Sequence, residues 1–305
     1  MKLVTYLKDG RETLGALHGD KVLALAAAAQ VIGTGVLPQT MLELITGGKS
    51  ALGIAKKTLA AAGADSRVAA LWTPLAGTRL RAPLPNMRKN VFCVGRNYKA
   101  HIEEGARAHG REVMFPKVPE FFSKPPTAII GNDDAIRLDA RHTQQLDYEV
   151  ELAIVIGTQC RDLTIEGALD AVFGYTIVND VSARDAQRAH GQWFKGKAFD
   201  TFCPIGPCIV TADEFGDPSG HRLSTRVNGA IRQDSNTSDM LFDCTHILTS
   251  LSAGVTLEPG DVIATGTPSG VALGMTPQQW LKDGDVVEAE VEGIGVLRNR
   301  VGAVT

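Results

Sequence analysis

The sequence has no long apolar run and no cluster of cysteines. None of its apolar stretches approaches the about 20 residues that a membrane-spanning helix needs. The opening residues, MKLVTYLKDG, contain no apolar core of the kind that a secretion signal has. The cysteines are odd in number and include no C-x-x-C pair: Cys93, Cys160, Cys203, Cys208 and Cys244. We therefore expect a cytoplasmic protein with free thiols and no membrane association.

An excess of charge of one sign is also lacking. Lysine and arginine number 31 and aspartate and glutamate 34, which gives a net charge of −3 with no long block of either sign. Neither nucleic acid nor an anionic membrane is therefore an expected partner. The 32 glycines and 14 prolines, many of them in turn-like dipeptides, favour a strand-rich fold with tight connections.

The length of 305 residues allows one large domain and a smaller one. Short strands are expected at Leu3–Leu7, Thr13–Leu17 and Lys21–Leu25, followed by alanine-rich helical segments up to residue 62. Several prolines then punctuate a basic connector between residues 74 and 85. We place the boundary there, with a small N-terminal domain at residues 1–80 and the main domain at residues 81–305.

The main domain is organised around the stretch LDYEVELAIVIG, residues 146–157. Alternation along a strand places Glu149 and Glu151 on one face, which continues with alanine and valine and so favours a buried strand. A second apolar strand, 171–178, ends next to Asp180 and could bring a third carboxylate alongside the pair. Three such carboxylates form a hard, oxygen-rich site suited to Mg²⁺, Mn²⁺ or Ca²⁺. A solvated acidic face is the alternative.

A histidine and a glutamate follow the first strand of the main domain, in GRNYKAHIEEGA. His101 and Glu104 are i and i+3 on the expected helix, so their side chains can touch. A carboxylate beside a histidine raises its basicity and fixes its tautomer, as a general base requires. A surface pair on an amphipathic helix is the alternative. Residues 105–122 show no clear period, and we interpret them as a loop that is either a lid or simply solvated.

Further polar groups follow the carboxylate strands. Residues 182–185 match a capping box that opens a short helix, on which Arg184 and Gln187 share a face. Arg184 could clamp a carboxylate or offset the acidic cluster. Asp239 is expected to cap a helix over residues 240–253, and the glycine-rich turn 265–270 could bind an anion through its backbone N–H groups.

Six blocks in this order resemble the fumarylacetoacetate hydrolase superfamily over residues 91–301: VGRNYKAHIEE, FSKPPTAI, LDYEVELAIVIG, GYTIVNDVSARDAQ, KAFDTFCPIGP and PGDVIATGTPSGV. The chain looks closer to the branch of acylpyruvate hydrolases and 2-hydroxyhepta-2,4-diene-1,7-dioate isomerases. The resemblance implies an α+β, predominantly β fold, in which a mixed β-roll catalytic domain follows a small N-terminal α+β domain. It also implies a site at one end of the roll and a homodimer.

The resemblance assigns roles to nine residues. It implies metal ligands for Mg²⁺ or Mn²⁺ at Glu149, Glu151 and Asp180, and a water-activating dyad of His101 and Glu104. Lys197 would stabilise an oxyanion or enolate. Substrate contacts would come from Arg184, Gln187, and both the backbone and the hydroxyl of Thr267.

The function that these residues predict is metal-dependent hydrolysis of acylpyruvates, such as fumarylpyruvate, in the catabolism of aromatic compounds or sugar acids. The dyad would activate water for attack on a 2,4-diketo acid, and carbon–carbon cleavage would leave pyruvate enolate beside the metal and Lys197. The partner is thus a small 2-oxo acid. The alternatives are an isomerase or decarboxylase of ring-cleavage dioic acids (the 5-carboxymethyl-2-hydroxymuconate type), an oxaloacetate decarboxylase, or an oxoacid-binding protein without turnover.

Overall fold

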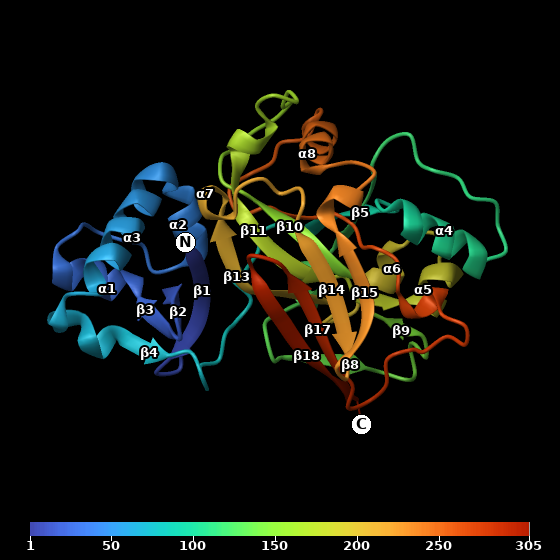
Figure 1. The fold of residues 1–305 in the computed structure, drawn as a ribbon, viewed down its shortest axis with the longest axis horizontal. Coiled ribbons are helices and arrows are strands. Elements are labelled where there is room, and N and C mark those ends of the chain that lie inside the picture. Colours follow the sequence, from blue (N-terminus) through green and yellow to red (C-terminus); the bar gives the residue numbers. More distant parts are fainter. Residues whose placement is uncertain (305) are drawn as a thin grey trace.

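The chain folds into an α+β structure in which strands predominate (Figure 1). The computed structural model describes residues 1–304. Within them, an 11-stranded sheet has the order β4-β3-β2-β1-β13-β11-β10-β16-β5-β6, with β7 paired to β13, and a five-stranded sheet has the order β15-β14-β17-β18-β8. Strands β12 and β9 form a separate pair. This architecture confirms the expected α+β, predominantly β fold class.

The leading part of the chain continues the large sheet. Its elements are β1 (Lys2–Lys8), β2 (Arg11–His18), β3 (Lys21–Ala24), α1 (Leu25–Ile32), α2 (Met41–Thr46), α3 (Gly48–Ala62) and β4 (Trp72–Pro74). Helix α2 begins with a capping box between Thr40 and Glu43. Strand β1 pairs antiparallel with β13, where Leu3 lies opposite Ile209. The leading strands therefore share a sheet with the main part, and the assignment of residues 1–80 to a separate domain stays a prediction.

The large sheet also contains the strands that carry the carboxylates. Its members from the main part are β5 (Val91–Gly95), β6 (Glu120–Lys124), β7 (Ile129–Ile130), β10 (Val150–Ile156), β11 (Val172–Asn179), β13 (Cys203–Thr211) and β16 (Val262–Ala264). Every residue of β10 and β11 is buried. On one face of β10, Ala153 and Val155 pack in an apolar cluster with residues of α1–α3; on the other, Leu152 and Ile154 pack with the second sheet.

The second sheet covers the other face of β10 and β11. It consists of β8 (Ala135–Leu138), β14 (Arg222–Val227), β15 (Ala230–Asn236), β17 (Val286–Val291) and β18 (Gly295–Ala303). In β17 buried residues alternate with partly exposed ones, as the period of two predicts, and Ala289 and Val291 join the shared core with Leu223 of β14. The core of the roll therefore lies between the two sheets.

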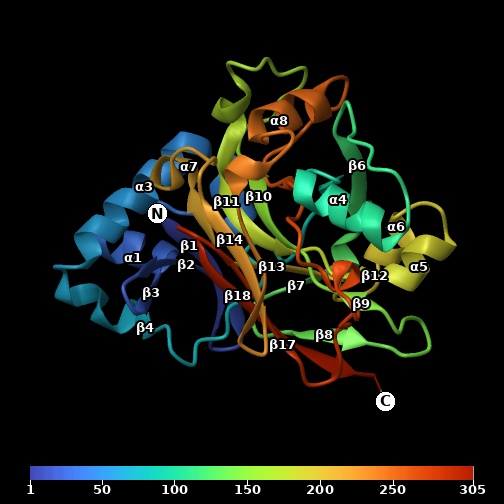
Figure 2. The ribbon, with the colours of Figure 1, turned by 45° about the vertical axis from the view of Figure 1, so that its right-hand side comes forward.

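The remaining helices lie around the roll. They are α4 (Lys99–Ala108), α5 (Arg184–Ala189), α6 (Phe194–Lys197), α7 (Ala212–Phe215), α8 (Cys244–Ser252) and a 3₁₀ helix, η5 (Ala272–Gly274), while the short pair is β9 (Leu146–Asp147) with β12 (Ser182–Ala183). Figures 1 and 2 show α4, α5 and α6 together on the side of the roll opposite α1–α3. In residues 1–304, no helix combines the length and the apolar character that crossing a bilayer requires.

Four local features differ from the sequence prediction. The capping box expected at residues 182–185 is absent, because α5 begins after Ala183 without a side-chain cap and the hydroxyl of Ser182 donates to the carbonyl of Asp180. The expected helix over residues 240–253 begins only at Cys244, and its cap is Asp243 rather than Asp239. The reason is tertiary: the backbone before it is held by Asn97, which bonds Phe242 through its side chain and Leu241 through its carbonyl. The carboxylate strand is divided into β9 and β10, and residues 105–122 include the end of α4 and the start of β6.

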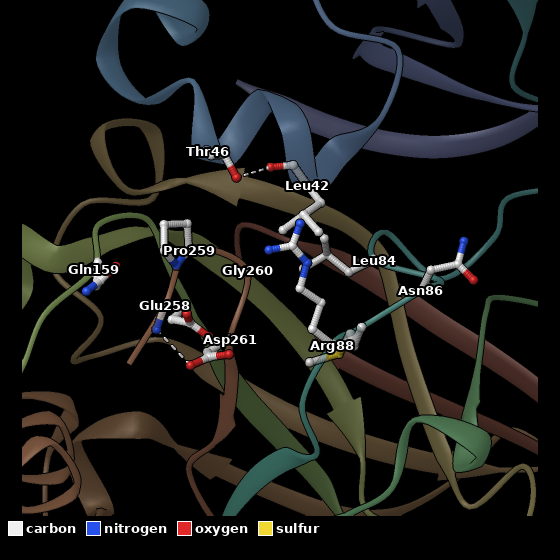
Figure 3. A pocket seen from close by; sticks show the side chains of 11 residues that line it. Leu42, Thr46, Leu84, Asn86, Arg88, Gln159, Glu258, Pro259, Gly260 and Asp261 are labelled. Atoms are coloured by element: carbon white, nitrogen blue, oxygen red, sulfur yellow. Dashed lines mark hydrogen bonds between the residues drawn. The ribbon is translucent and has the colours of Figure 1, made fainter. Parts of the chain in front are cut away.

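A pocket of about 220 Å³ lies where α2 meets the connector and the loop after β10 (Figure 3). In it the side chain of Arg88 extends toward Leu42, and Asp261 accepts a hydrogen bond from the backbone N–H of Glu258. Lys89 pairs with both acidic residues at 2.9 Å. The residues that line this pocket include none of the predicted site residues, which gather elsewhere.

Candidate active site

Three buried carboxylates meet at the ends of β10 and β11. The antiparallel register places Val150 opposite Asn179, and the N–H of Asp180 donates to the carbonyl of Glu149 at 2.8 Å. Glu149 and Asp180 are therefore opposite each other, and Glu151 shares their face. One oxygen from each carboxylate lies within 4.8 Å of the others. The structure thus brings together the three carboxylates that the sequence predicted to be neighbours.

Two buried lysines bind this cluster. The ammonium of Lys197, at the end of α6, donates to Glu149 at 2.6 Å and to Asp180 at 2.7 Å. Lys124, the last residue of β6, donates to the second oxygen of Asp180 at 2.5 Å and to the carbonyl of Val181 at 3.0 Å. Asp180 is thus held between two ammonium groups, which fixes the orientation of its carboxylate.

The carboxylates differ in their electrostatic environments. Burial raises the pKa of Glu149, but the charges of Lys197 and Arg184 outweigh burial and hold that pKa below its ordinary range. Burial raises the pKa of Glu151 well above its ordinary range, and the negative charges of Asp180 and Glu149 raise it further. Burial also lowers the pKa of Lys197, but Asp180 and Glu149 more than reverse this. Glu151 is therefore the carboxylate whose negative charge is not fully neutralised by neighbouring positive charges.

This donor set fits a divalent cation. Within residues 1–304, Glu151 forms no ion pair, and its recorded hydrogen bond comes from the N–H of Gly266 at 2.8 Å. A buried carboxylate without a counter-charge is costly, and a cation held by Glu149, Glu151 and Asp180 would supply that charge. Because all three donors are carboxylate oxygens, the site suits a hard ion such as Mg²⁺ or Mn²⁺.

Arg184 lies against the acidic cluster. Its Nη2 donates to Glu149 at 2.5 Å, its Nε to Asp147 at 2.9 Å, and its Nη1 to Gln187 at 3.2 Å. In this structure Arg184 therefore offsets the acidic cluster, which is one of the two roles that the sequence left open. The contact of Arg184 and Gln187 with a substrate stays a prediction.

His101 and Glu104 form the expected pair on α4. Nδ1 of His101 lies 3.3 Å from Oε2 of Glu104, and the other oxygen of Glu104 accepts the N–H of Gly270 at 2.9 Å. Gly274 leaves the space that Glu104 occupies, since a Cβ at that position would lie 2.1 Å from Cγ of Glu104. Among the described residues, Nε2 of His101 has no hydrogen-bond partner, so it is the nitrogen that can exchange a proton with a ligand.

Thr267 lies in the glycine-rich turn after β16. Its hydroxyl donates to the carbonyl of Val150 at 2.9 Å and accepts Nε2 of Gln233 at 2.8 Å. The hydroxyl hydrogen is therefore committed within the fold. Within residues 1–304 the backbone N–H of Thr267 makes no hydrogen bond, and this N–H is the group of Thr267 that can donate to a substrate carboxylate.

Two buried charged residues of the site had no role in the sequence prediction. Lys124 is the middle residue of FSKPP, and Asp147 is the second residue of LDYEVE, two residues before the first expected metal ligand, Glu149. The signal for Lys124 was a lysine at the end of an expected strand, directly before Pro125-Pro126. Asp147 carried no distinct signal, because it follows the same period of two as Glu149 and Glu151, and the sequence pattern does not distinguish it from them.

Comparisons with known proteins identify the family of this chain. The sequence profile of the family described as Fumarylacetoacetate (FAA) hydrolase C-terminal matches residues 90–302. Oxaloacetate tautomerase YisK of Bacillus subtilis is 45% identical over 228 residues, which cover 75% of this chain and 74% of that protein.

Two solved structures extend the likeness to the whole chain. The fumarylacetoacetate hydrolase of Exiguobacterium antarcticum has a TM-score of 0.79 at 44% identity, with 100% of both chains covered. Maleylpyruvate hydrolase of Sphingobium sp. SYK-6, in complex with manganese(II) and pyruvate, has a TM-score of 0.78 at 31% identity, again over 100% of both chains. The family profile covers well over half of the chain, and the three carboxylates lie together in the fold as the resemblance implied. This protein therefore belongs to the fumarylacetoacetate hydrolase superfamily.

Proposed function

We propose that this protein catalyses keto–enol tautomerisation of a 2-oxo dicarboxylic acid of the oxaloacetate class, with a divalent metal ion as cofactor. The observation that carries this proposal is that one turn, residues 266–270, contacts both the buried carboxylate cluster and the His101–Glu104 pair: the N–H of Gly266 donates to Glu151 and that of Gly270 to Glu104. Tautomerisation needs one base that can give and take a proton and one place that stabilises an enolate. Both are present. The 45% identity to an oxaloacetate tautomerase supports the same reaction.

His101 is the proton carrier in this proposal. Its Nδ1 faces Glu104, which fixes the tautomer with Nε2 unprotonated and free to act as a base. Removing a proton from carbon 3 of the substrate breaks a C–H bond, and the electron pair forms the C2–C3 double bond while the keto oxygen becomes negative. Returning the proton to that oxygen completes the enol, and the reverse sequence restores the ketone.

A bound cation and Lys197 would stabilise the negative charge that develops on the keto oxygen. Glu149, Glu151 and Asp180 would hold a divalent ion, which would supply Lewis-acid polarisation of the keto oxygen. The ammonium of Lys197 is pre-oriented by two of these carboxylates and needs no reorganisation to stabilise an enolate. The free N–H of Thr267 and the amide of Gln187 are the donors that we assign to substrate carboxylates.

Hydrolysis of acylpyruvates is the second candidate. The same histidine could take a proton from water instead of carbon, and the enolate of pyruvate would form at the same place after carbon–carbon cleavage. The likeness to maleylpyruvate hydrolase at 31% identity supports this reading. The two reactions differ in product mass, because hydrolysis consumes water and tautomerisation does not.

The test uses protein stripped of metal and reloaded with Mg²⁺ or Mn²⁺. The substrates are enol-oxaloacetate, acetylpyruvate, fumarylpyruvate and a ring-cleavage dioic acid, with the enol followed by ultraviolet absorbance and products identified by mass. We expect metal-dependent loss of the oxaloacetate enol without a change of mass. Pyruvate and a free acid from a diketo acid would establish hydrolysis in its place, and release of carbon dioxide would establish decarboxylation.

A matched pair of histidine variants identifies the base. His101→Ala should lower kcat by about 10²- to 10⁴-fold, the usual contribution of a general base. His109→Ala is the control, because His109 is exposed just after the same helix and bonds only the carbonyl of Gly105. Equal activity of the two variants would contradict the assignment of His101.

A further inference from the structure

Asp147 joins the two halves of the candidate site. It is fully buried on β9, and both of its carboxylate oxygens are occupied by hydrogen bonds. One oxygen accepts the N–H of Tyr148 at 2.9 Å and that of Ala272 at 2.7 Å; the other accepts the N–H of Leu273 at 3.1 Å and Nε of Arg184 at 2.9 Å. These donors come from three segments that are far apart in the sequence.

One set of contacts leads to the metal side. Arg184, held by Asp147, donates its Nη2 to the expected metal ligand Glu149. Asp147 therefore sets where the guanidinium lies relative to the carboxylate cluster.

The other set leads to the acid–base side. The N–H groups of Ala272 and Leu273 open η5, which would otherwise leave these donors buried without partners. Gly274 ends η5 and lies against the side chain of Glu104, leaving no room for even a methyl group. Just before η5, the N–H of Gly270 donates to Glu104. Residues 270–274 thus form the support on which Glu104 rests, and Asp147 anchors this support.

We propose that Asp147 is a positioning residue that holds the His101–Glu104 pair in register with the metal-binding carboxylates. It acts on the pair through η5 and Glu104, while its hydrogen bond with Arg184 ties it to the carboxylate cluster, and it needs no contact with the substrate. The kinetic test of this inference rests on the proposed function, and the structural test does not. Figure 2 shows β9, α5 and α4 on one side of the molecule, where these contacts are made.

The structural arm measures hydrogen–deuterium exchange in the metal-free full chain. Asp147→Asn keeps the shape but turns an amide N–H₂ toward two donors, so the anchor of η5 is lost. We expect faster exchange at residues 270–274 and also in α4, which carries Glu104. Asp185→Asn is the matched control, because this carboxylate begins the same helix as Arg184 but bonds Thr143 and Gln144 instead of η5. Faster exchange confined to residues 270–274, with α4 unchanged, would overturn the coupling.

The kinetic arm is a double-mutant cycle. Asp147→Asn should lower kcat about 100-fold, as expected when a catalytic group shifts by about 1 Å, while KM and Mn²⁺ affinity change about threefold or less. In a Glu104→Gln background the same substitution should cost about threefold or less, because the group through which it acts is already disabled. Equal losses in both backgrounds would refute the role in positioning Glu104.

A reciprocal variant keeps the inference testable if Asp147→Asn does not fold. Glu104→Ala removes the acceptor of the Gly270 N–H, and coupling through η5 requires faster exchange at residues 270–274 in that variant. No change there would overturn the inference. Hydrogen exchange does not depend on turnover. If the proposed reaction is wrong, the exchange experiment therefore still tests the coupling, and the two failures can be told apart.

Discussion

Replacing Lys197 by methionine tests the balance of charge in the carboxylate cluster. The ammonium is 3% exposed and pairs with Glu149 and Asp180, which are themselves buried. Methionine keeps most of the length of the side chain but leaves two buried carboxylates without this partner. Removing one member of a buried ion pair typically costs about 3–5 kcal/mol. For a chain of 305 residues that loss corresponds to a fall in Tm of about 5–8 °C.

A bound metal ion should restore much of this loss. The same carboxylates are the expected metal ligands, and a cation would replace the missing positive charge. Metal at about 100 times its Kd stabilises a protein by about 2.7 kcal/mol. In Lys197→Met the stabilisation should be larger than in the unsubstituted protein, because no ammonium competes for Glu149 and Asp180. The Tm difference between the two proteins should therefore shrink when Mn²⁺ is added.

The assay is thermal unfolding in EDTA and in saturating Mn²⁺, together with Mn²⁺ affinity and kcat. Turnover should fall by about 10²- to 10³-fold, the loss seen when an oxyanion donor is removed, while Mn²⁺ binds at least as tightly as before. Lys195→Met is the control: Lys195 is exposed on the same helix, with its ammonium 4.8 Å from the centroid of Phe199. The reasoning is refuted if Lys197→Met is as stable as the control in EDTA, or if Mn²⁺ widens the difference.

Three further outcomes follow from the structure. Gly274→Ala should displace Glu104 and lower kcat about 100-fold with unchanged Mn²⁺ affinity. Gly53→Ala is the control, because Gly53 lies in open space within α3, and it should raise stability by about 0.5–1 kcal/mol. Equal kcat in the two variants would contradict the packing argument. The pKa of Glu151 is higher in the folded metal-free protein than in the unfolded chain, so between these two pKa values the folded state binds more protons. The free energy of unfolding of the metal-free protein should therefore fall as pH rises through that window. Mn²⁺ binding should then release a proton, and calorimetry in buffers of different ionisation enthalpy that finds no proton release would be evidence against the raised pKa. The homodimer stays a prediction, and light scattering should give twice the 32.4 kDa mass of the chain.

Local periodicity accounts for what could be predicted of the carboxylates. Alternation along residues 149–156 placed Glu149 and Glu151 on one face, and the apolar run of β11 ended just before Asp180. The helical period likewise placed His101 and Glu104 in contact. These predictions succeed because the side-chain direction follows from backbone geometry within a single element. The role of each residue came from the family resemblance, and the identity of the substrate stays a proposal.

The start of α8 shows a limit of local signals. Asp239 and Asp243 are both suitable helix caps by residue type. The choice falls on Asp243 because Asn97, about 145 residues earlier in the chain, bonds the backbone of Phe242 and holds it out of the helix. A sequence pattern contains no information about that contact.

The sequence by itself determined the strands, the acidic cluster and the histidine–glutamate pair, since each depends on spacing within one element or on the end of one strand. Only the tertiary structure decided which charges neutralise that cluster and what supports the pair. Lys124 reaches Asp180 across 56 positions, and Asp147 reaches Ala272 across 125. Such contacts depend on which distant segments the fold brings side by side, and burial then makes them specific, because each buried charge needs its own partner.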